Sequence, residues 1–183
     1  MARYKLTKLF KEMVNDDDSF LDSGENTDYE IFVDMDGTIT DFNKRFIDLV
    51  GEEPHHYEKR EGIEEFWNQI DNVHGVKFWA GMEWMPAGQR LWNYVQKAGA
   101  KLLSSPSWGN TSRLGKRIWV KHNIPGTKLI LTNRARKQNY SGKDKILIDD
   151  RQDTIDEWNA KGGIGILFTD TQDTINKLKE LGI

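Results

Sequence analysis

The sequence contains no cysteine, and none of its apolar runs is long enough to form a membrane-spanning helix. The first absence excludes a disulfide framework and a thiolate zinc site. A spanning helix needs about 18 or more consecutive apolar residues, and the first 20 residues also lack the apolar core and cleavage pattern of a secretory signal. We therefore expect a cytoplasmic protein that has no membrane partner.

The chain also lacks an excess of basic residues, an internal repeat and a low-complexity linker. Its formal net charge is −3 over 183 residues, whereas proteins that follow nucleic acid backbones usually cluster lysine and arginine. A small ligand is therefore a better expectation than a nucleic acid partner. The sequence is also compatible with a homodimer. At this length, one α/β domain with a modest insertion fits better than two independent domains.

Short apolar runs alternate with helical patterns along most of the chain. The runs predict five strands, at 29–34, 100–104, 127–132, 145–149 and 164–168. The patterns predict helices at 86–98, 111–122, 152–161 and 171–181. This alternation predicts an α/β fold with a doubly wound, parallel, five-stranded sheet.

About 65 residues separate the first two predicted strands, far more than an ordinary crossover needs. Apolar residues at helical spacing within 42–50 and 63–70 predict two amphipathic helices there. We predict a small helical cap at 43–85, inserted into a core domain made of 29–42 and 86–183. Residues 1–28 form an N-terminal extension with a predicted helix, which either docks on the domain or serves as a partner-binding arm. Its apolar positions are Leu6, Leu9, Phe10, Met13 and Val14.

Acidic residues end the first and fourth predicted strands. Because the carboxyl ends of parallel strands meet at the ligand-binding edge of such a sheet, we expect these acids to converge. Crowded carboxylates repel one another unless a cation or a proton intervenes, and oxygen-only ligands select a hard ion such as Mg²⁺. The structural alternatives are an acidic turn for the first pair and helix capping for the second. The predicted metal ligands are Asp34, Asp36, Asp149 and Asp150.

The same strand ends predict chemistry on a phosphoryl group. Because a divalent ion neutralises phosphate charge, the carboxylate of Asp34 could attack phosphorus and form an aspartyl-phosphate. Asp36 would protonate the leaving oxygen and then take a proton from the hydrolytic water. The hydroxyl of Ser104 and the ammonium of Lys137 would hold the phosphate. For Ser104 the alternative is ordinary turn chemistry before Pro106.

Four segments, in this order, resemble the signatures of the haloacid dehalogenase superfamily. They read IFVDMDGTITD at 31–41, LLSSP at 102–106, Lys137, and ILIDDR at 146–151. Within that superfamily the sequence is similar to the 5'(3')-deoxyribonucleotidases and their phage and bacterial relatives over roughly 29–168. The resemblance implies a Rossmann-like haloacid dehalogenase fold and a magnesium-dependent phosphatase whose substrate is a nucleoside monophosphate.

The resemblance also implies roles for three further residues. Phe42 and Trp79 match aromatic residues that form the base pocket, and Ser105 matches a residue that assists at the phosphate; core packing is the alternative for both rings. The segment from Lys137 to the fourth strand is longer than usual in the family, which leaves Lys143 as an alternative phosphate lysine, and serine replaces the usual threonine at position 104. A phosphotransferase, a 3'-phosphatase on nucleic acid ends and a non-catalytic phosphate-binding protein are the other functions compatible with the sequence.

Overall fold

The computed structural model describes residues 29–183, so the predicted N-terminal helix lies outside the described residues. Five strands form one parallel sheet in the order β5-β4-β1-β6-β7. Their bounds are Glu30–Val33 (β1), Lys101–Ser104 (β4), Leu129–Leu131 (β5), Lys145–Asp149 (β6) and Ile164–Leu167 (β7). The predicted doubly wound, five-stranded parallel sheet is confirmed. None of the helices in this range has the length and apolar composition needed to cross a bilayer.

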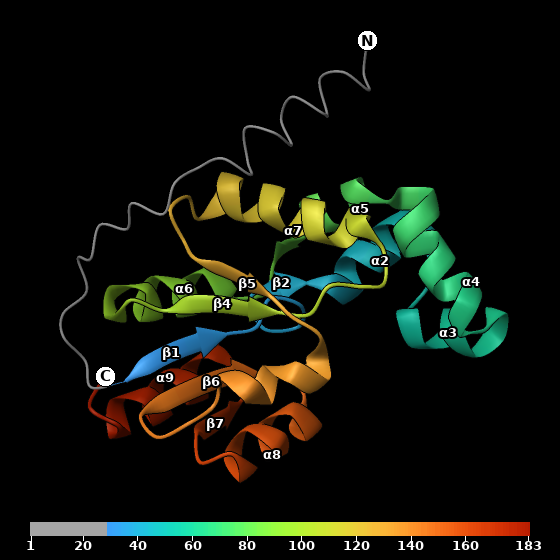
Figure 1. Ribbon diagram of the computed structural model, residues 1–183. Helices are drawn as coiled ribbons and strands as arrows, with labels where there is room; N and C mark the ends of the chain where they lie inside the picture. The colour runs from blue at the N-terminus through green and yellow to red at the C-terminus, as the bar shows by residue number, and fades with distance from the viewer. Residues whose placement is uncertain (1–28) are drawn as a thin grey trace.

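Helices cover both faces of the sheet (Figure 1). Ile31 and Val33 of β1 belong to a buried cluster shared with α6 (Gly88–Val95), α7 (Asn110–Asn123) and α9 (Thr171–Glu180). Phe32 points to the other face, where it packs in a second cluster with α8 (Gln152–Ala160). Because β1 is central and buried on both faces, its sequence is continuously apolar, which made this strand predictable.

The long interval between β1 and β4 contains more structure than the two predicted helices. Before α6 it contains α2 (Phe42–Val50), α3 (Pro54–Glu61), α4 (Ile63–Asn68), a π-helix η1 (Gln69–His74) and α5 (Val76–Ala80). A short 3-10 helix η2 (Gln96–Ala98) follows α6. A short antiparallel ribbon of β2 (Thr40–Asp41) and β3 (Glu83–Trp84) closes its base. Phe46, Phe66 and Phe78 of this insertion lie in the same buried cluster as Val33. The insertion therefore shares one hydrophobic core with the sheet.

A single glycine lets α5 lie directly against α7, as the two neighbouring helices in Figure 1 show. A Cβ atom on Gly115 of α7 would lie 2.4 Å from Trp79 Cβ and 2.9 Å from the carbonyl oxygen of Val76. Any side chain larger than hydrogen would push the helices apart. Gly115 thereby sets where Trp79 lies relative to the carboxyl ends of β1 and β4.

Candidate active site

A tight turn after β1 brings two segments together that are more than a hundred residues apart in the sequence. The amides of Ile39 and Thr40 both donate to the carbonyl oxygen of Met35, which closes the turn. Gly37 has a φ of +77°, and a Cβ there would lie 2.3 Å from Asp150 Oδ2. Glycine is required because only it combines this backbone conformation with such a close approach. The carboxylate of Asp150 therefore rests on the turn that follows Asp34.

Three carboxylates converge at the ends of β1 and β6. Asp34, Asp149 and Asp150 each offer one oxygen, and these atoms all lie within 4.8 Å of one another. Although Asp150 is exposed overall, the surrounding protein desolvates its carboxylate and raises its pKa to about 7, and the charges of Asp34 and Asp149 add to the effect. Burial and the charge of Asp34 also raise the pKa of Asp149, although Lys137 opposes the shift. A divalent cation would relieve this repulsion, and the donors are all oxygens, so the three residues fit a hard ion such as Mg²⁺.

The ammonium of Lys137 lies between two of these acids. Its Nζ is 2.9 Å from Asp34 Oδ1 and donates to Asp149 Oδ2 at 2.7 Å. The side chain is buried; burial lowers the pKa of Lys137, but the two carboxylates outweigh it and raise the pKa overall. Lys143, the alternative lysine, is exposed on the segment before β6. Of the two candidates, the structure brings Lys137 to the acids.

Asp36 is not part of the three-carboxylate group. Its Oδ2 accepts a hydrogen bond from Lys116 Nζ, and the same ammonium donates to Ser104 Oγ at 2.8 Å and to the carbonyl oxygen of Ser105 at 3.1 Å. Burial raises the pKa of Asp36, with a further contribution from the charge of Asp34, whereas Lys116 lowers it. The carboxylate of Asp36 is therefore held by a cation on α7, and its predicted role as a metal ligand stays a prediction.

Lys116 was missed by the sequence reasoning. It is fully buried, and its ammonium also lies 5.0 Å from the centre of the Trp79 ring. A signal was present in the sequence, because Lys116 falls at helical spacing with Ser112, Trp119 and Val120, all of which are buried on one face of α7. A lysine on the apolar stripe of a helix needs an anionic partner inside the protein.

The acids open into a cavity of about 710 Å³, which we call the main cavity. The predicted base-pocket residues Phe42 and Trp79 line it, and their ring centres lie 5.9 Å apart. Ser105 also lines it, with a buried hydroxyl that has no hydrogen-bond partner among the described residues. Ser104 is instead fully buried beside Lys116, outside the lining, so its predicted contact with phosphate stays a prediction. Among the predicted site residues, those that line the main cavity are Asp34, Asp36, Phe42, Trp79, Ser105, Lys137 and Asp150.

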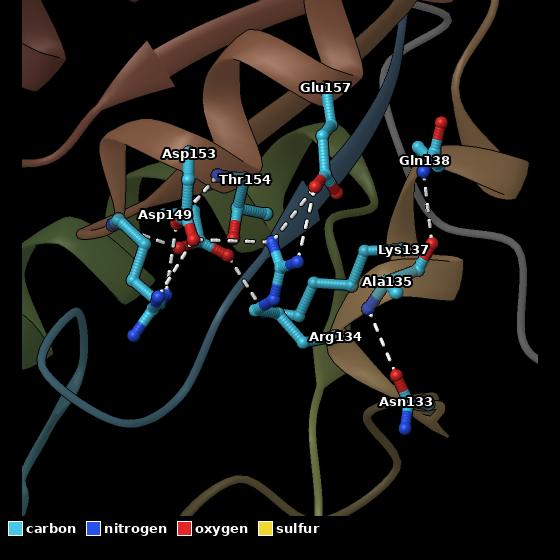
Figure 2. A network of polar contacts seen from close by, with 10 residues as sticks. Asn133, Arg134, Ala135, Lys137, Gln138, Asp149, Asp153, Thr154 and Glu157 are labelled. Atoms are coloured by element: carbon cyan, nitrogen blue, oxygen red, sulfur yellow. Dashed lines mark hydrogen bonds and ion pairs between the residues drawn. The ribbon is translucent and has the colours of Figure 1, made fainter.

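Two arginines at the rim of the main cavity are held by acids of α8. Arg134, at the start of the 3-10 helix η3 (Arg134–Tyr140), donates two hydrogen bonds of 3.1 Å to Glu157 Oε1, as Figure 2 shows. Its guanidinium is also 3.3 Å from Asp153, which accepts a pair of hydrogen bonds from Arg151. Because both arginines are already paired, they add little free positive charge at this rim.

Comparisons with known proteins bear on the fold. No protein-family model and no curated protein matches the chain. A solved hydrolase from Streptococcus pneumoniae TIGR4 is 13% identical; the match covers 84% of this chain and 100% of that chain, with a TM-score of 0.51. The chain thus has a Rossmann-like α/β fold with a parallel five-stranded sheet.

Two further solved structures match with TM-scores of 0.48. A phosphonoacetaldehyde hydrolase-like protein from Oleispira antarctica is 12% identical over 84% of this chain and 81% of that chain. A haloacid dehalogenase-like hydrolase from Burkholderia xenovorans LB400 is 13% identical over 76% of this chain and 81% of that chain. At these identities, structural similarity speaks to fold, and function has to be argued from the site.

Proposed function

We propose that the protein is a magnesium-dependent phosphomonoester hydrolase that acts on nucleoside monophosphates through an aspartyl-phosphate intermediate. The observation that carries the proposal is the convergence of Asp34, Asp149 and Asp150, with oxygens within 4.8 Å of one another, around the buried ammonium of Lys137. Mg²⁺ held by these carboxylates would neutralise charge on the substrate phosphate. Lys137 then balances the negative charge of the nucleophile and its neighbours.

The roles of the two acids after β1 follow from their surroundings. Asp34 lines the main cavity, where its carboxylate attacks phosphorus as the bond to the leaving oxygen breaks. The raised pKa of Asp36 suits a group that first gives a proton to the leaving oxygen and then accepts one from water. Water attacks the aspartyl-phosphate, releases inorganic phosphate and restores the Asp34 carboxylate.

The cavity walls support a nucleoside as the group that carries the phosphate. The buried Ser105 hydroxyl, which lacks a partner, is available to donate to a phosphate oxygen. The half-buried Phe42 offers aromatic surface to a base, and the buried Trp79 ring packs behind it with 5.9 Å between the ring centres. A volume of about 710 Å³ is in the range of cavities that bind ligands of this size.

The test is release of inorganic phosphate from a panel of nucleoside monophosphates and from ribose 5-phosphate, with and without Mg²⁺. We expect Mg²⁺-dependent turnover that favours nucleotides, and its loss in Asp34→Asn by a factor of about 10³ or more. Turnover that survives in Asp34→Asn would contradict the assigned nucleophile. Equal rates on nucleotides and ribose 5-phosphate would contradict the nucleotidase assignment while leaving the phosphatase assignment in place.

Two lysines give a matched pair for the same assay. Lys137→Gln removes the ammonium beside Asp34 and Asp149, so we expect a loss of about 10²-fold or more in kcat. Lys143→Gln changes an exposed residue of the same type, six residues further along the chain, and should leave kcat unchanged. A larger effect at Lys143 than at Lys137 would show that the wrong lysine has been assigned.

A further inference from the structure

A second cavity adjoins the main cavity on the side of the insertion. Its volume is about 600 Å³, and Trp67 of α4 and Trp108 of the loop between β4 and α7 line both cavities. We call this second space the cap cavity. Trp108 lies three residues after Ser105, so an aromatic side chain stands at the junction of the two spaces.

Trp108 has no role in the packing of the described residues. It is 94% exposed, and it lies near Ile63, a second exposed apolar residue that lines the cap cavity. Large aromatic side chains normally bury most of their surface, because the hydrophobic effect strongly favours it. An indole left in water beside a hollow therefore indicates a surface that is covered when a ligand binds.

The charges around the cap cavity define what could cover it. Its lining includes the carboxylates of Glu64 and Asp71 but neither lysine nor arginine, so a phosphate group would be repelled. Apolar and aromatic side chains with acceptors at the rim suit a flat, uncharged ring that carries N–H donors. A nucleobase with an exocyclic amino group has this chemistry.

Asp71 also fixes the wall that the two cavities share. Its Oδ1 accepts hydrogen bonds from Ser107 Oγ at 2.8 Å, from Thr111 Oγ1 at 3.2 Å and from Trp79 Nε1 at 3.2 Å. The carboxylate thus ties the π-helix η1 to the loop that carries Trp108 and to the buried Trp79 ring. These hydrogen bonds hold the chain on either side of Trp108 in place against η1, so the indole projects from a fixed stretch of backbone.

A cation is available in the lining of the main cavity. Arg113 lines the main cavity and makes no ion pair or side-chain hydrogen bond within residues 29–183. Arg134 and Arg151, in contrast, are already paired with acids. A guanidinium without a carboxylate partner is suited to a phosphodiester.

From these observations we infer that the cap cavity binds a second nucleobase against Trp67 and Trp108, with Arg113 facing the phosphodiester that joins it to the first nucleotide. The substrate of the proposed phosphatase is then a dinucleotide or short oligonucleotide end with a terminal phosphate. This inference rests on the proposed function for the reaction that the protein catalyses. The base-binding site itself is inferred from the residues that line the cap cavity. The net charge of −3 and the small volume favour a short occupant over a long nucleic acid.

The kinetic test compares a nucleoside monophosphate with dinucleotides that carry a 5'-terminal or a 3'-terminal phosphate, and with the same dinucleotides lacking the second base. Stacking of the added base should raise kcat/KM about tenfold for at least one dinucleotide, which corresponds to about 1.4 kcal/mol. Trp108→Ala should erase this gain, so that kcat/KM for the dinucleotide falls about tenfold further than kcat/KM for the mononucleotide, and Trp108→Phe should retain most of it. Equal values for the complete dinucleotides and those lacking the second base would overturn the inference.

A further variant tests the role of Arg113, and a second serves as a control for Trp108→Ala. Arg113→Gln should lower kcat/KM for the dinucleotide by a larger factor than kcat/KM for the mononucleotide, and it should weaken the dependence of the dinucleotide value on salt. Val73→Ala is the matched control, because Val73 is 58% exposed on η1 but lines neither cavity. An equal loss in Trp108→Ala and Val73→Ala would mean that the exposed indole has no specific role.

A binding measurement separates this inference from the proposed function. A dinucleoside monophosphate has the phosphodiester but no terminal phosphate, so its binding requires no catalysis. Its binding is measured by the quenching of tryptophan fluorescence. Binding that weakens about tenfold in Trp108→Ala supports the base site even if no phosphate is released from any nucleotide. Binding that is absent, or equal in both proteins, overturns the base site even if the phosphatase assay succeeds.

Discussion

Replacement of Lys116 by methionine tests whether the buried ammonium of α7 neutralises Asp36. The substitution keeps the unbranched shape of the side chain and removes its charge. Asp36 would then lose its cation partner, and Ser104 Oγ would lose a donor at 2.8 Å. The predicted consequence is a less stable protein whose deficit depends on pH.

The size of the effect follows from the burial of the pair. Breaking a fully buried ion pair costs about 3–5 kcal/mol. The Lys116 side chain is fully buried, but 24% of the Asp36 side chain is exposed, so water can solvate part of the remaining charge. We therefore expect the free energy of unfolding to fall by about 2–3 kcal/mol at pH 8.

The sign of the pH dependence follows from the pKa of Asp36. Burial and Asp34 already raise this pKa, and removal of Lys116 takes away the largest influence that lowers it. An aspartate whose folded pKa exceeds its unfolded value binds a proton more readily when folded, so stability declines as pH rises between the two values. The deficit of Lys116→Met should therefore be smaller at pH 5 than at pH 8.

Urea denaturation of Mg²⁺-free protein at the two pH values, followed by circular dichroism, measures the deficit. The double variant Lys116→Met with Asp36→Asn removes both charges and should recover at least half of the loss at pH 8. Lys101→Met breaks a partly exposed pair with Glu30 and should cost about 1 kcal/mol or less. A deficit that is the same at both pH values, with no recovery in the double variant, would refute the electrostatic account.

Four more predictions concern the glycines and the carboxylate group. Gly37→Ala places a Cβ against Asp150 and strains a φ of +77°, so Mg²⁺ affinity measured by titration calorimetry should fall about tenfold or more; unchanged affinity would refute the contact. Because the pKa of Asp150 is raised to about 7, Mg²⁺ should bind progressively more weakly below pH 7, and affinity that is flat from pH 5 to 8 would contradict this. In Mg²⁺-free protein, the same shift should make stability decline from about pH 4 to pH 7 in a thermal melt, whereas saturating Mg²⁺ should abolish the decline. Gly115→Ala, which crowds Trp79, should lower the free energy of unfolding by about 1–3 kcal/mol in urea, and full stability would show that α5 and α7 can separate freely.

Two features beside the site were hidden from sequence reasoning because their signals are local and ambiguous. Asp71 reads as one acid in a polar helix, yet its contacts with Ser107 and Thr111 join segments about 40 residues apart in the sequence. Trp108 was not singled out by the sequence analysis, and its exposure appears only in the structure. Composition and periodicity describe one element at a time, so contacts between elements do not appear in them.

The sequence by itself determined the sheet and the acids that lie at its edge. Continuous apolar runs specify buried parallel strands, and the acids that end them, Asp34 and Asp149, must meet where those strands end side by side. Only the tertiary structure decided which lysine joins them, how the insertion packs and where the second cavity lies. These depend on the three-dimensional meeting of side chains such as Lys116 and Gly115 with partners far along the chain, and the periodicity of one segment carries no information about that distance.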